Sequence, residues 1–87
     1  MKKQVEIIEV EGEGLEKLLG QRVTLLCMNY FYHGKLIGVN TDDVLLEDAH
    51  IIYETGDWSK ANWSDAQKVC DELYVRTSAI ESFGIIK

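Results

Sequence analysis

A strand-forming region over residues 21–55, interrupted by two glycines, constrains the fold of this chain most strongly. Turn sequences at 29–30 and 40–43 divide the region into three segments rich in β-prone residues. Gly34 and Gly38 both fall inside the middle segment, where glycine usually marks a bulge, a bend or a close backbone approach. We therefore predict three antiparallel strands with a sharply curved middle strand, as a small barrel requires.

The segment before this region has two parts. Residues 1–14 are interpreted as an N-terminal arm that contains a β-prone stretch at 5–10. Leucines at i, i+3 and i+4 then predict a short amphipathic helix over 15–20, which Gly20 ends.

The segment after the three strands is less regular. Residues 56–72 predict a long loop held in place by Trp58 and Trp63, with a helical turn that starts at a capping-box pattern following Ser64. Residues 73–84 predict the last two strands, separated by a tight corner. The expected fold class is thus mainly β, with a short helix followed by a strongly bent five-stranded antiparallel barrel in one domain, 1–87.

A bent five-stranded sheet of this size leaves strand edges to be covered. The chain has 87 residues, of which 46% are hydrophobic, so hydrophobic surface is plentiful for a thin core. Unpaired edges promote aggregation unless another strand pairs with them. If the last strand of one copy pairs with the penultimate strand of the next, the contact is heterologous and can close into a ring. We therefore predict that the chain self-associates, and that the assembly closes into a ring if the rotation between neighbouring copies is right.

Composition and charge exclude several functions. The formal charge of −6 argues against a broad surface that neutralises nucleic-acid phosphates. Cys27 and Cys70 form no metal-binding pattern and are expected to be reduced thiols of a cytoplasmic protein. His33 and His50 have no Cys, Asp or Glu at the spacing of a metal site, and no nucleophile motif accompanies them. We expect no enzyme activity, no cofactor, no metal and no membrane segment.

Four short motifs stand out, at residues 20–25, 34–40, 44–48 and 75–80. Together they resemble the motifs of Sm and Lsm proteins, the Hfq-like superfamily, and most of all those of short Sm-like proteins of bacterial or phage type. Residues 20–25 (GQRVTL) follow the predicted helix as in that family. Residues 34–40 (GKLIGVN) are similar to the Sm1 core G-x-L-x-G-(apolar)-D, and 44–48 (VLLED) to the segment after it. Residues 75–80 (VRTSAI) resemble the Sm2 motif, (apolar)-R-G-x-x-(apolar). The likeness spans roughly residues 15–84.

The resemblance implies a ring formed through the fourth and fifth strands, which binds short, often uridine-rich RNA around its central hole. By position, Asn40 falls on the Asp of the base pocket and Asp43 on its Asn. Arg76 matches the pocket Arg, and Thr77 replaces the Gly. Three features depart from the pattern of a base pocket. β-Branched Thr77 restricts the backbone and crowds the corner where the family has glycine. Ionised Asp43 can only accept hydrogen bonds, and Asp42 stands where an aromatic side chain would stack on a base.

Two functions follow as hypotheses. The first is a ring subunit that binds single-stranded RNA through Arg76 and its neighbours. The second is a ring-shaped protein-interaction scaffold without a working RNA pocket, suggested by the acidity and by Trp58 and Trp63 in the long loop. Arg76 itself has two candidate roles, because it can contact RNA or form an ion pair with Asp43 or Asp48.

Overall fold

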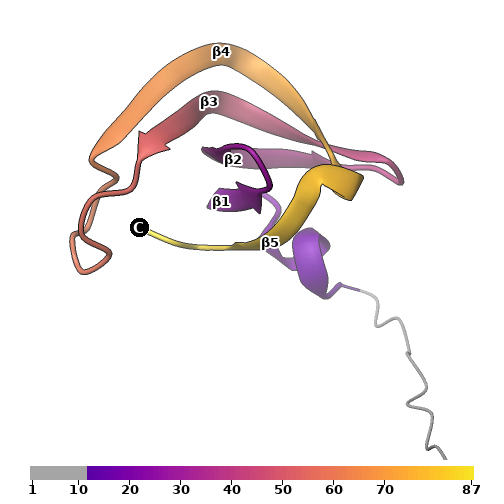
Figure 1. Cartoon of the computed structure of the whole chain (residues 1–87). Helices are drawn as coiled ribbons and strands as arrows, with labels where there is room; N and C mark the ends of the chain where they lie inside the picture. The colour runs from indigo at the N-terminus through magenta and orange to yellow at the C-terminus, as the bar shows by residue number, and fades with distance from the viewer. Residues whose placement is uncertain (1–11) are drawn as a thin grey trace, which may run out of the picture.

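The computed structural model describes residues 12–87, which form a single five-stranded antiparallel sheet with the strand order β4-β3-β2-β1-β5 (Figure 1). The expected mainly β fold is confirmed. The arm over 1–14 and its β-prone stretch lie almost wholly outside the described residues. The elements in chain order are η1 (Gly14–Leu18), β1 (Arg22–Cys27), β2 (Phe31–Val39), β3 (Asp43–Glu54), β4 (Asp65–Arg76), η2 (Thr77–Ala79) and β5 (Ile80–Gly84).

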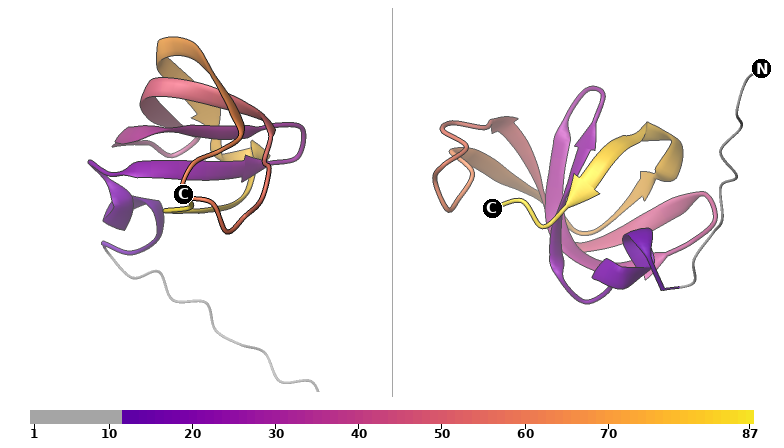
Figure 2. Two further views of the ribbon diagram at one scale, coloured as in Figure 1. Left: turned by 90° about the vertical axis from the view of Figure 1, so that its left-hand side faces the viewer. Right: turned by 90° about the horizontal axis from the view of Figure 1, so that it is seen from below.

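The sheet curls around its own hydrophobic side chains. The two longest strands, β3 and β4, arch over β1 and β2, and β5 crosses the opposite side (Figures 1 and 2). No pairing joins β4 to β5 in the described part of the chain, so the sheet is bent but not closed. Its core consists of Val23, Leu25, Cys27, Leu36, Val44, Leu46, Ala49 and Val75.

The bend in β2 coincides with its two glycines. The ladder between β2 and β3 shifts register between His33 and Lys35, and again between Leu36 and Gly38. A Cβ at Gly34 would lie 3.0 Å from the carbonyl oxygen of Glu47, and one at Gly38 would lie 3.2 Å from the Cβ of Leu45. The expectation of a bulge, a bend or a close approach at the two glycines is therefore confirmed, with backbone as the close neighbour at Gly34 and a side chain at Gly38.

Gly34→Ala is expected to destabilise the protein by about 1–3 kcal/mol, because the added methyl group meets backbone that cannot move without opening the ladder. Urea unfolding followed by circular dichroism measures the change. Gly84→Ala is the matched control, since its Cβ would meet only ordinary contacts at 3.7 Å or beyond. Equal stabilities of the two variants would contradict this account of the bend.

The expected helix at 15–20 is wrong as an α-helix. The chain forms a 3-10 helix over Gly14–Leu18, and the side chain of Glu13 makes no capping hydrogen bond there. A single turn is too short to offset the unfavourable free energy of helix nucleation. Packing of its side chains therefore determines the backbone conformation of this segment. Leu15 and Leu18 pack against the core, whereas Leu19 is exposed. No helix within residues 12–87 has the length and apolarity needed to cross a membrane.

The helical turn expected inside 56–72 is also wrong, because β4 already begins at Asp65. Residues 65–72 are mostly polar and exposed, so they lack the apolar alternation that predicts a strand. They are extended because they pair with β3 over most of its length, from Glu54 opposite Asp65 onward. The loop is correspondingly shorter, between Glu54 and Asp65.

Candidate functional site

The four predicted site residues meet at one corner, where the turn between β2 and β3 touches the end of β4. The backbone N–H of Asn40 donates to the carbonyl of Asp43 at 2.8 Å and closes the turn. Asp43 is the cross-strand partner of Arg76, and the N–H of Thr77 donates to the carbonyl of Asp42 at 2.9 Å. We call this group of five residues, 40, 42, 43, 76 and 77, the corner site.

Side chains in the turn give the corner site its hydrogen-bonding character. Nδ2 of Asn40 donates to Oδ1 of Asp43 at 2.8 Å, which leaves the Asn40 carbonyl oxygen as an acceptor. Asn40 is exposed and Asp43 half-buried. The turn therefore offers acceptors to base N–H groups, beside the five donors of the Arg76 guanidinium.

Arg76 makes neither of the ion pairs considered for it. It is exposed, and within residues 12–87 no carboxylate oxygen lies within 4.0 Å of its guanidinium. Asp48 pairs instead with Arg22 at 3.1 Å and with Lys68 at 3.4 Å. The guanidinium of Arg76 is thus exposed without a charged partner in the described part of the protein.

Thr77 fits the corner without strain. Outside glycine, positive φ angles occur in the described chain only at Asp48 and Lys87. The backbone at Thr77 therefore adopts a conformation open to any residue, and the corner does not require glycine. Thr77 opens η2, the short 3-10 turn that leads into β5.

The tryptophans of the loop have different environments. Trp63 is buried, packs edge-on against Trp58 at 5.1 Å between ring centroids, and lies 6.3 Å from Phe31. Trp58 is 54% exposed. Trp63 holds the loop in place as expected, and Trp58 presents an indole to the surroundings.

Thr24 is the centre of a hydrogen-bond network that the sequence did not reveal. Its buried hydroxyl donates to the carbonyl of Ile86 at 2.9 Å and accepts from Nε1 of Trp63 at 3.3 Å. Nδ1 of His33 lies 2.8 Å from the same oxygen, so His33 donates from Nδ1 and its Nε2 accepts from Nε of Arg22 at 3.4 Å. All hydrogen-bonding capacity of the hydroxyl is used.

Burial lowers the pKa of His33, and the neighbouring positive charge of Arg22 lowers it further. A protonated ring would also turn its Nε2 acceptor into a donor facing Arg22. Within the described residues, no group of three His, Cys, Asp or Glu side chains is placed to hold a metal ion. His33 is thus a neutral structural hydrogen-bonding residue at neutral pH.

Stability is expected to fall as the pH drops below the ordinary histidine pKa of about 6.5, toward the lowered pKa of folded His33. Between these two pKa values, His33 is protonated in the unfolded chain and neutral in the folded chain. The free energy of unfolding therefore falls as the pH falls. Unfolding temperatures from pH 7.5 to 5.5 measure the effect. His33→Gln should flatten the curve, and an unchanged slope in this variant would contradict the assignment.

Comparison with known proteins adds no identification. No protein-family profile matches the chain, and no curated protein matches it at a significant level.

Proposed function

We propose that the chain is an Sm-like subunit of a closed homo-oligomeric ring, and that the ring binds short single-stranded RNA at the corner site. The observation that carries this proposal is the strand order. β4 and β5 follow each other in sequence yet lie at opposite edges of the sheet, and each has one side with which no strand of residues 12–87 pairs. Pairing β4 of one copy with β5 of the next repeats the same contact around a ring.

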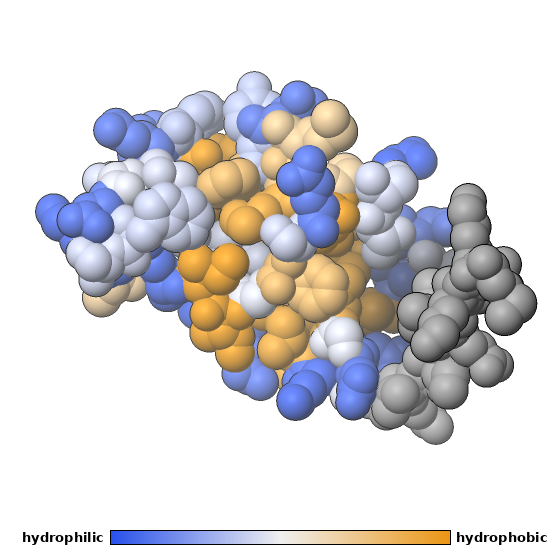
Figure 3. Space-filling view, turned by 60° about the horizontal axis from the view of Figure 1, so that its bottom comes forward, coloured by the Kyte–Doolittle hydropathy of each residue, from blue (hydrophilic) through white to orange (hydrophobic). Residues whose placement is uncertain are grey.

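Exposed apolar side chains support an interface at these edges. Tyr74 on β4 is 62% exposed and Phe83 on β5 is 40% exposed, and Val69 and Ile85 are exposed nearby. Figure 3 shows a continuous hydrophobic area in the middle of the side across which β5 runs in Figure 2. Aromatic side chains in particular are enriched where protein surfaces associate.

The corner site supports RNA as the ligand of the ring. It lies at the junction of β4 and η2, so every copy in a ring would carry one equivalent site. Arg76 supplies the positive charge and the fork of donors that suits a phosphate or a base edge. Asn40 and Asp43 supply acceptors, and the carboxylate of Asp43 favours an N–H donor of a base over its carbonyl groups.

Arg76→Ala is expected to weaken RNA binding at least about tenfold, the effect of losing one strong guanidinium contact. Fluorescence anisotropy with short U-rich and A-rich oligonucleotides at low salt measures the affinity, because electrostatic contacts weaken as salt rises. Lys60→Ala removes an exposed charge from the loop between β3 and β4 and serves as the control. No saturable binding, or equal losses in both variants, would reject the corner site as an RNA site.

The exposed indole of Trp58 favours a second candidate function, a ring used as a protein-interaction scaffold. In that case Trp58→Ala should abolish binding of a purified partner while the unfolding temperature changes little, since the side chain is more than half exposed. Trp63→Ala is unsuitable for this test because Trp63 is buried beside Thr24. Titration calorimetry with the partner measures the effect, and unchanged affinity would exclude the loop as its docking point.

A further inference from the structure

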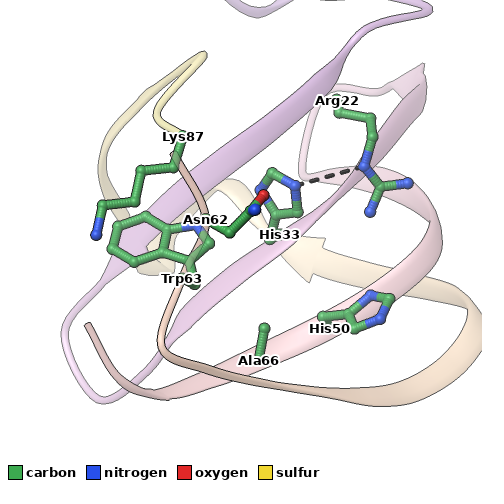
Figure 4. Close-up of a pocket in the computed structure, with 7 residues that line it drawn as sticks. All are labelled: Arg22, His33, His50, Asn62, Trp63, Ala66 and Lys87. Carbon is green, nitrogen blue, oxygen red and sulfur yellow. Dashed lines mark hydrogen bonds between the residues drawn. The ribbon is translucent and has the colours of Figure 1, made fainter. Parts of the chain in front are cut away.

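A pocket of about 300 Å³ lies at the other end of the sheet from the corner site, under the loop that joins β3 to β4 (Figure 4). It is formed where β1, β2, β3 and the start of β4 approach the segment that follows β5. Nothing in the proposed RNA site accounts for it. The lining residues are Arg22, His33, His50, Asn62, Trp63, Ala66 and Lys87.

The side chains that line the pocket are rich in nitrogen-bearing groups and include no carboxylate. They contain one guanidinium, two imidazoles, one amide and one ammonium group. The chain as a whole carries a formal charge of −6. The two imidazoles have no N–H left for a ligand, because both Nδ1 protons are used within the protein. The donors of Arg22, Asn62 and Lys87, with no acidic side chain among the seven lining residues, favour an anion as the ligand.

Arg22 is held in a fixed orientation at one wall. Its Nε donates to His33 at 3.4 Å, and its Nη1 donates to Asp48 at 3.1 Å. His33 is fixed in turn by Thr24 in the buried network. Two of the guanidinium nitrogens are thus occupied, and Nη2 has no partner among the described residues. A fork fixed in this way loses little further freedom when it binds an oxyanion.

The other walls complete the pocket. Nδ1 of His50 lies 2.9 Å from the carbonyl of Asp48, which assigns its proton to Nδ1 and leaves Nε2 without a partner in the described residues. Asn62 projects from the exposed loop beside Trp63, and its amide lies in front of the His33 ring in the view of Figure 4. Lys87 lies 4.4 Å from the ring centre of Trp63 and donates to the carbonyls of Thr55 and Asp57, so it closes the loop side.

We propose that this pocket binds a small phosphate monoester, with the guanidinium of Arg22 and the amide of Asn62 as donors to the phosphate oxygens. Because Nε and Nη1 of Arg22 are paired with His33 and Asp48, the N–H groups of its Nη2 are the ones that donate to the phosphate. The volume is at the lower end for ligand sites and suits a phosphate with one small organic group, such as a nucleoside monophosphate. The proposal concerns a single subunit and does not depend on ring formation or on RNA binding at the corner site.

The test is titration of the full chain with inorganic phosphate, adenosine 5′-monophosphate and adenosine, followed by calorimetry and by the fluorescence of Trp58 and Trp63. Both phosphate compounds should bind saturably, and adenosine should not. Arg22→Gln should weaken phosphate binding at least about tenfold. Arg22→Lys keeps the charge without the fork and should lose only part of the affinity.

Two further variants separate binding from folding. Asn62→Ala changes an exposed loop residue and should weaken binding without lowering the unfolding temperature. Lys60→Gln removes a charge from the same loop outside the pocket and should leave binding unchanged. The proposal is overturned if neither phosphate compound binds, if adenosine binds equally well, or if binding survives both Arg22→Gln and Asn62→Ala. Loss of phosphate binding in Arg76→Ala would also overturn it, because the ligand would then occupy the corner site.

Discussion

The structure depends on one constraint, the hydrogen bonding of backbone groups along a sheet that bends without closing. In the described part of the chain, β1, β2 and β3 pair with a strand on both sides, whereas β4 and β5 each have one unpaired edge. The close approach at Gly34 and Gly38 allows the bend that carries these two edges to opposite sides of the core. A second copy can supply the missing pairing, and the exposed apolar side chains beside both edges fit that arrangement.

The first half of the fold could be predicted from the sequence, and the second half only in part. The strands at Arg22–Cys27, Phe31–Val39 and Asp43–Glu54 lie close to their expected positions, since turn residues bound them clearly. The sequence predicted the end of β4 but missed its first eight residues, because they carry little apolar pattern and are extended through pairing with β3. Tertiary pairing overrode the local helical signal after Ser64.

The two sites differ in how far the sequence predicted them. The residues of the corner site lie in two short motifs, and the ladder between β3 and β4 brings Asp43 and Arg76 together. The pocket around Arg22 was not foreseeable, since its residues come from six separate segments. Only the register that places His33 opposite His50, together with the path of the chain after β5, assembles it. Nothing in the sequence marked Thr24 as the centre of a hydrogen-bond network, because threonine is a common residue in strands.

The assembly state of the purified protein tests the central claim most directly. Multi-angle light scattering after size exclusion at micromolar concentration gives the absolute mass. The unpaired edges predict one discrete species whose mass is an integer multiple of the 9.9 kDa chain, unchanged on moderate dilution. A single species at 9.9 kDa that stays monomeric across this range would contradict the account.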